Sequence, residues 1–226
     1  MAPEPDAHLS GMSGFPQIAR MAGRGNRLAT LVSAFAFAFS AVSFYETVLK
    51  QPRLRIYVTD TLAYTRDPWG GYEVIAVPVT IANSGARDGA VITLELDVKN
   101  LESGKVERFA SAYTADAQYF AGSDDVARRI KRPKLPFAPL SISGRGAFAG
   151  TILFYSPEGR EQKLIEPNAK VEMTLRASMP AADSRLEAMF AAQPAQIQMH
   201  GEVASFLPGA LLVGDMARVR LTTAAP

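Results

Sequence analysis

The sequence predicts a mainly β chain, with a single N-terminal transmembrane helix followed by an antiparallel β-sandwich. Three observations support this. An uncharged apolar run extends from Leu28 to Tyr45. Short segments with alternating apolar and polar residues follow it, and that period of two is typical of strands with one buried face. Polar turn residues separate these segments, as expected for an antiparallel sandwich.

The apolar run is long enough to span a bilayer. Between Leu28 and Lys50 the only charged residue is Glu46. As a helix, this span crosses a hydrocarbon core of roughly 30 Å. A helix is required because lipid offers no hydrogen-bond partner to the backbone. We therefore expect a disordered cytoplasmic tail over residues 1–25, rich in Pro and Gly, and a transmembrane helix over residues 26–49, with residues 28–49 in the bilayer.

The charges that flank the helix leave its orientation open. Three cations lie on each side of it: Arg20, Arg24 and Arg27 before, and Lys50, Arg53 and Arg55 after. The positive-inside rule therefore does not decide. Because the large folded part is C-terminal, we expect a single-pass protein of the inner (plasma) membrane whose C-terminal domain is periplasmic or extracytoplasmic.

A cleaved signal peptide is the alternative to a permanent anchor. The segment Ala36-Phe37-Ala38 matches the small-x-small cleavage pattern. However, the apolar run continues past it to Tyr45, which favours an uncut signal-anchor. Cleavage would make the chain a secreted protein, and both readings place the domain on the outer side.

One face of the predicted helix carries small residues. They recur at spacings of three and four, which lets two membrane helices approach closely. They are Ala29, Ser33, Ala36, Ser40 and Ser43. This face is a candidate for packing against a partner helix or a second copy in a homo-oligomer. Chance in an Ala/Ser-rich helix is the alternative, since GxxxG is absent.

Composition excludes several classes of chemistry. The chain has 226 residues, no cysteine and two histidines. Without cysteine there are no disulfides, zinc-thiolate sites or iron–sulfur clusters. The net charge of +2 is too small to indicate nucleic-acid binding. We predict no cofactor, no metal site and no catalytic residue.

The predicted sandwich covers residues 53–223. Clear alternation predicts strands at Val91–Lys99, with Ile92 among the inward residues, at Val171–Ala177 and at Val219–Leu221. More uniformly apolar segments predict strands at 74–81 and 151–155. Pro78 cannot donate to a sheet ladder, which puts it at an edge or a bulge. Residues 183–192 predict one short helix.

A turn in this domain carries a family resemblance. A β-branched strand leads into Asn83-Ser84-Gly85, and an alternating strand follows. This arrangement resembles the Asn-Thr-Gly turn of bacterial immunoglobulin-like (CARDB-type) adhesion and scaffold domains. The resemblance implies an immunoglobulin-like sandwich with a binding or spacing role and no chemistry. The Cys…Trp…Cys core of antibody domains is missing, since Trp69 lies in a Pro/Gly loop.

Catalytic motifs are weak. His200 is the only histidine available to the outer domain as a general base, and no G-x-S-x-G nucleophile elbow accompanies it. A surface histidine on a strand is the simpler reading, and a hydrolase built on His200 is the alternative. We therefore predict that the chain is not an enzyme.

A basic segment is the first candidate contact site for a partner. Its proposed contact residues are Arg128, Arg129, Lys131 and Arg132, with Phe137 in the Pro-interrupted apolar stretch that follows. Such a patch suits an acidic protein partner, lipid headgroups or polyanionic glycans. A solvated loop neutralised by Asp124 and Asp125 is the alternative.

Aromatic residues in the loops give the runner-up function. Rings stack on sugars, so the set suggests a glycan- or peptidoglycan-binding module. The set is Tyr64, Asp67, Trp69, Tyr72 and Tyr119. Residues that cap a core are the alternative reading. The sequence as a whole predicts a membrane-anchored, non-catalytic binding or scaffold protein of the bacterial cell envelope, with a protein partner and no nucleic acid.

Overall fold

The structure is a computed structural model. It describes residues 16–66, 71–115, 135–157, 163–180, 195–212 and 216–222. The chain divides into two units, Met1–Val48 and Leu49–Pro226, and each is described by itself.

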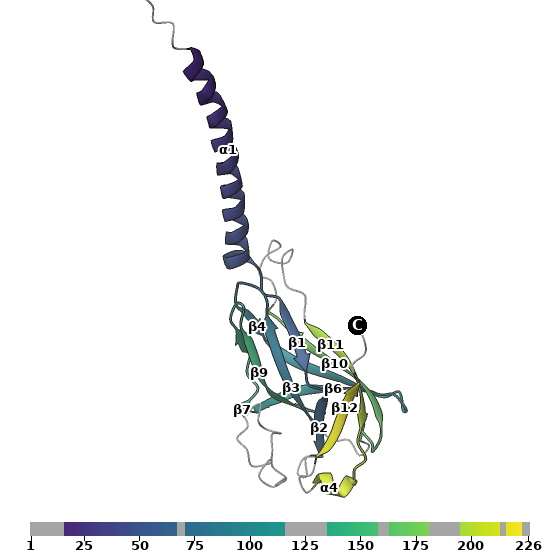
Figure 1. The fold of residues 1–226 in the computed structure, drawn as a ribbon. Coiled ribbons are helices and arrows are strands. Elements are labelled where there is room, and N and C mark those ends of the chain that lie inside the picture. Colours follow the sequence, from purple (N-terminus) through teal and green to yellow (C-terminus); the bar gives the residue numbers. More distant parts are fainter. Residues whose placement is uncertain are drawn as a thin grey trace, which may run out of the picture. The chain divides into compact units, whose positions relative to one another are not determined.

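The first unit is helical. Helix α1 spans Pro16–Phe44, so it begins N-terminal to residue 26, and the π-helical turn η1 (Tyr45–Leu49) follows (Figure 1). The segment Arg27–Leu49 is 23 residues long and is apolar enough to cross a membrane. Its side chains are exposed up to Leu49, including the small-residue face from Ala29 to Ser43. A signal sequence passes the same test of length and composition, so this finding supports a membrane-spanning segment and no finer topology.

The secondary-structure elements described in the second unit are almost all strands (Figure 1). In chain order they are β1 (Leu54–Val58), β2 (Thr61–Arg66), β3 (Glu73–Asn83), β4 (Gly89–Val91), β5 (Thr93–Asn100), β6 (Val106–Ala115), β7 (Leu135–Pro136), β8 (Leu140–Ile142), β9 (Ala147–Tyr155), β10 (Lys170–Ser178), β11 (Gln196–Val203) and β12 (Ala217–Thr222). A short helix, α4 (Pro208–Leu212), precedes β12.

Eight of these strands close into an antiparallel barrel. The hydrogen-bonded circuit runs β3-β2-β12-β11-β10-β5-β6-β9 and returns to β3. Strand β9 closes the ring because it pairs with β3 along one edge and with β6 along the other. The predicted immunoglobulin-like sandwich is therefore wrong. In a sandwich two sheets face each other with separate edges, whereas here one sheet closes on itself.

The barrel interior is filled with side chains. Inward residues alternate with outward ones along each strand, as Leu94, Leu96 and Val98 show on β5. They join the inward residues of the other strands in one continuous apolar cluster. The same alternation would occur in a sandwich, because both architectures bury one face of every strand. The sequence pattern therefore located β3, β9, β10, β12 and most of β5, and it left the partners of these strands undetermined.

Pro78 lies where the ladder is irregular. Val58 pairs with Val79 and Ala63 pairs with Ala76, so residues 59–62 face only residues 77–78 of β3. On the other side, Pro78 pairs with Thr151 of β9. The expectation was an edge or a bulge at Pro78; β3 is paired on both sides and is no edge strand, and Pro78 lies opposite the gap between β1 and β2. This irregularity divides one long strand into β1 and β2, both of which pair with β3.

Ile92 departs from the expected pattern. It is 40% exposed, whereas Val91 and Leu94 are buried. The reason is a break between β4 and β5 at Ile92, whose N–H donates to the carbonyl of Ser178 at 2.8 Å. Val91 and Leu94 both point inward although they are three positions apart, so the alternation is interrupted between them. Ile92 is therefore not one of the inward residues.

Asn83 fastens one end of the barrel. Its buried side-chain oxygen accepts hydrogen bonds from the N–H groups of Arg53 (3.1 Å) and Gly85 (2.9 Å). Its amide nitrogen donates to the carbonyls of Arg87 (2.8 Å) and Ile142 (3.3 Å). One side chain thus joins the start of β1, the turn after β3 and the end of β8. The turn predicted at Asn83-Ser84-Gly85 is therefore present in the structure, where it is part of a barrel and not of a sandwich.

Candidate functional site

A polar groove of about 390 Å³ lies on the outer surface of the barrel. Strands β2, β11 and β12 and the turn before β10 form it. Its polar lining residues are Thr61, Asn168, Glu202, Arg218 and Arg220. All five are exposed, so the groove is open to partners from solution.

Strand alternation places the charges in the groove. On β12, Ala217 and Val219 point into the barrel, so Arg218 and Arg220 point outward. Arg220 pairs in register with Glu202 of β11 on one side and with Thr61 of β2 on the other. Neither arginine side chain forms a hydrogen bond or ion pair with the described part of the chain. Their guanidinium groups are therefore available to a ligand.

A tight turn supplies the remaining wall of the groove. Asn168 has a left-handed backbone, with φ of 60°, which asparagine tolerates better than most residues. The N–H of Ala169 donates to the carbonyl of Glu166 at 3.2 Å. The N–H of Val203 donates to the carbonyl of Ala169 at 3.0 Å, which holds the turn against β11.

A buried carboxylate fixes the chain that leads into this turn. Glu73 is 2% exposed, and it accepts hydrogen bonds from the N–H groups of Leu164 (2.8 Å) and Ile165 (3.0 Å). It also accepts a hydrogen bond from the hydroxyl of Tyr64 at 2.7 Å. The position of Asn168 in the groove wall thus depends on a network inside the barrel end.

Arg66 completes that network. Its Nε donates to the Tyr64 hydroxyl oxygen at 3.0 Å, and a terminal nitrogen donates to the carbonyl of Ile165 at 3.0 Å. Its guanidinium lies 5.6 Å from the ring centroid of Phe206. Burial, followed by the negative charge of Glu73, raises the pKa of Tyr64 well above its ordinary value. Tyr64 therefore keeps its proton and remains a donor to Glu73.

The groove has the chemistry of a binding site for an anionic group. Two adjacent guanidinium groups bind carboxylates or phosphates through paired N–H donors. The amide of Asn168 and the hydroxyl of Thr61 add neutral hydrogen-bonding groups. The carboxylate of Glu202 lies beside Arg220 and favours a ligand that also carries a donor. A polar peptide segment with an acidic side chain meets all of these requirements.

The predicted basic contact segment lies mostly outside the described residues, namely Arg128, Arg129, Lys131 and Arg132. Phe137 is described. It is half-buried and packs against the main core, and its N–H donates to the carbonyl of Ala112 at 2.9 Å. Leu135, on β7, is 69% exposed. Of the predicted contact region, the structure therefore describes Phe137, which packs against the core, and Leu135, which is exposed.

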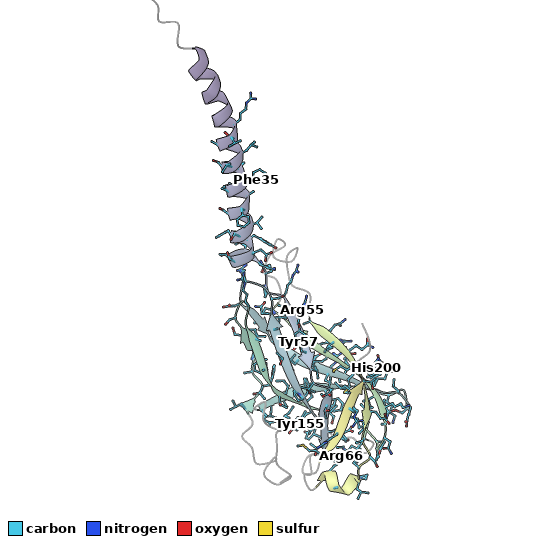
Figure 2. All side chains as sticks on the ribbon, in the orientation of Figure 1. Phe35, Arg55, Tyr57, Arg66, Tyr155 and His200 are labelled. Carbon is cyan, nitrogen blue, oxygen red and sulfur yellow. The ribbon has the colours of Figure 1, made fainter. Side chains whose placement is uncertain are left out.

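The two members of the predicted aromatic set that the structure describes, Tyr64 and Tyr72, lie in different surroundings. Tyr64 is fully buried in the core, and its ring centroid lies 5.7 Å from that of Phe206. Tyr72 instead stacks edge-on against Tyr155 at 6.0 Å, and Tyr155 stacks in turn against Tyr113. Asp67, Trp69 and Tyr119 lie outside the described residues. Figure 2 labels Tyr155 on β9 and Arg66 on β2.

His200 lies on the outer surface of β11 (Figure 2). It is half-buried, and it pairs in register with Glu172 of β10 and Thr222 of β12. Within the described ranges, no group of three or more His, Cys, Asp or Glu side chains is placed to hold a metal.

The groove was not predicted from the sequence. The available signal was the Arg218-Val219-Arg220 alternation, which places two arginines on the same side of a strand. The contributions of Asn168 and Glu202 could not have been found in this way, because they depend on the pairing of β11 with β12 and on the turn beside them.

Comparisons with known proteins do not show a family for this chain. No family model matches it, and no curated protein matches it. Among solved structures, it is similar to a Bordetella pertussis protein whose assignment as ApaA is itself provisional. The identity is 16% and the TM-score 0.32, over 69% of this chain and 96% of that one. A similarity at this level supports no conclusion about function.

Proposed function

We propose that this chain is a membrane-anchored, non-catalytic binding protein of the bacterial cell envelope. Its apolar helix anchors it in the inner membrane in a single pass, and its barrel binds a partner protein on the extracytoplasmic side. Anchoring concentrates the barrel near partners in the same membrane, which strengthens weak contacts without new interactions.

The filled interior of the barrel carries this proposal. The large side chains inside it, such as Phe109, Ile152 and Phe154, are fully buried within the core cluster. A barrel that binds a small molecule inside needs an internal cavity lined by a few polar groups. Packing here favours recognition by the outer surface, where Arg218 and Arg220 line the groove and form no ion pair with an acidic side chain in the part of the chain that the structure describes.

Cross-linking and co-purification from native membranes test the proposal. The test variant is Arg218→Gln with Arg220→Gln. The matched control is Lys105→Gln with Arg176→Gln, which removes the same charge from exposed positions outside the groove. We expect a protein that the wild type and the control recover to be lost with the groove variant. Equal recovery by all three chains would refute the groove as the contact site.

Two further measurements separate the alternatives. Retention in the membrane after alkaline carbonate extraction, with an intact N-terminal mass, distinguishes an anchor from a cleaved signal peptide. The second measurement is sedimentation with purified peptidoglycan. If the wild type and the groove variant both sediment with it to the same extent, a glycan-binding module is favoured instead.

A further inference from the structure

Five cationic residues gather at the end of the barrel where the chain enters it. They are Lys50, Arg53, Arg55, Arg87 and Arg145, and all except the half-buried Lys50 are exposed. We call them the basic collar. Across the segments that carry them, 50–55, 83–92 and 140–147, the only acidic residue is Asp88. Five positive charges against one negative charge give these three segments a net charge of +4.

The collar is a fixed surface. The carbonyl of Lys50 accepts hydrogen bonds from the N–H groups of Ala86 (3.0 Å) and Arg87 (3.1 Å). The N–H of Arg145 donates to the carbonyl of Gly85 at 2.9 Å, although Arg145 has a left-handed backbone with φ of 58°. The buried Asn83 amide ties the same segments together. The cations are therefore held at set positions on three linked segments.

Chain connectivity brings this surface close to lipid. Lys50 directly follows the apolar segment Arg27–Leu49 in sequence. Its carbonyl is already hydrogen-bonded into the barrel, so no spacer separates the anchor from the collar. When the helix spans a membrane, its end lies at the headgroup layer. Lys50 then lies next to the headgroup layer through chain connectivity alone, and hydrogen bonds link its backbone to the segment that carries Arg87.

We infer that the basic collar binds the phosphate groups of anionic phospholipids and thereby holds this end of the barrel at the membrane surface. Arginine suits this role, because its planar guanidinium donates two hydrogen bonds to one phosphate. Anionic leaflets attract such clusters, and the attraction decays within a Debye length. The inference rests on the proposed membrane anchoring, and the groove plays no part in it.

A lipid-quenching experiment tests the inference. The chain has no cysteine, so a single reporter can be placed at Ser84→Cys, in the collar, or at Ser103→Cys, in the turn between β5 and β6. The full chain is labelled with a fluorophore and reconstituted into nanodiscs. These discs carry spin-labelled phosphatidylglycerol or spin-labelled phosphatidylcholine at the same mole fraction. We expect spin-labelled phosphatidylglycerol to quench the fluorophore at residue 84 about fivefold more strongly than spin-labelled phosphatidylcholine. This is the enrichment of anionic lipid expected from roughly one cation at the membrane surface.

Variants separate this inference from anchoring itself. The triple change Arg53→Gln, Arg87→Gln, Arg145→Gln should reduce the quenching ratio to about one, while the matched triple change Lys105→Gln, Lys170→Gln, Arg176→Gln should leave it unchanged. Equal quenching by both lipids in the wild type, or a ratio that survives the collar substitutions, overturns the inference while anchoring stands. A chain that fails to remain in the nanodiscs overturns both.

Discussion

Replacing Glu73 by glutamine exchanges one oxygen for an amide nitrogen, yet it should strongly lower the free energy of unfolding of the barrel. One carboxylate oxygen accepts from Ile165 N–H and Tyr64 hydroxyl, and the other accepts from Leu164 N–H. Glutamine keeps the shape but turns one oxygen into a donor. In either orientation of the amide, one buried backbone N–H then faces another donor and loses its acceptor.

The size of the effect follows from that geometry. A buried donor left without a partner costs about 1–3 kcal/mol, and the remaining bonds lose the strengthening that a charged acceptor provides. We expect the free energy of unfolding to fall by roughly 2–4 kcal/mol, a large part of the roughly 5–15 kcal/mol typical of a domain. The melting temperature should fall by about 5–12 °C for a domain of this size.

Urea unfolding of the full chain in detergent micelles, followed by the circular dichroism of the strands, measures this loss. Glu166→Gln is the matched control, because it makes the same change at an exposed position in the same loop. A Glu73→Gln chain that unfolds at the same urea concentration as the Glu166→Gln chain would refute the assigned network.

Four further outcomes are expected. Because the pKa of Tyr64 is raised in the folded chain, the folded form keeps a proton that the unfolded form releases above its ordinary pKa of about 10. Stability should therefore be unaffected by this group below that pH. Above it, stability should fall by up to about 1.4 kcal/mol per pH unit, a slope that Tyr64→Phe should lack in pH-dependent urea titrations. Gly85→Ala and Gly144→Ala would place a methyl group 2.1 Å from Gln51 O and 1.9 Å from Ala86 O. Each should cost roughly 2–4 kcal/mol, whereas Gly209→Ala, with nothing within 4 Å, should change the unfolding midpoint little. Phe154→Ala should lower unfolding stability by about 3–5 kcal/mol, because this fully buried ring would leave a cavity in the barrel. Ala36→Leu with Ser40→Leu should reduce cross-linked dimers in membranes if the small-residue face of α1 mediates self-association, and unchanged dimer yield would exclude that face.

Several strands could be found from the sequence because they are apolar throughout or have one buried face. The alternation from Val171 to Ala177 matches β10, and the apolar segment 74–81 lies within β3. The pairing of the strands was not accessible in the same way. Whether β9 bridges β3 and β6 depends on contacts between residues far apart in the chain, and no local period encodes them.

The candidate site shows the same limit. Arg218 and Arg220 face outward by simple alternation, which the sequence displays. Glu73 stands directly before the predicted strand 74–81, and nothing in the sequence marks it as buried. Only the folded chain brings its carboxylate to the backbone of Leu164 and Ile165. The turn at Asn83 was recognised from its residues, yet its hydrogen-bond partners Arg53 and Ile142 were not, because they come from distant parts of the chain.

The pairing of β2 with β12 determines when, during synthesis, the barrel can close. These strands come from the beginning and the end of the second unit, with Thr61 opposite Arg220. During synthesis β2 has no lateral neighbour on that edge until β12 (Ala217–Thr222) has been made. An exported chain would therefore cross the membrane unfolded, and its barrel would close only after β12 has emerged. Deletion of β12 should then leave export intact while exposing the product to proteases.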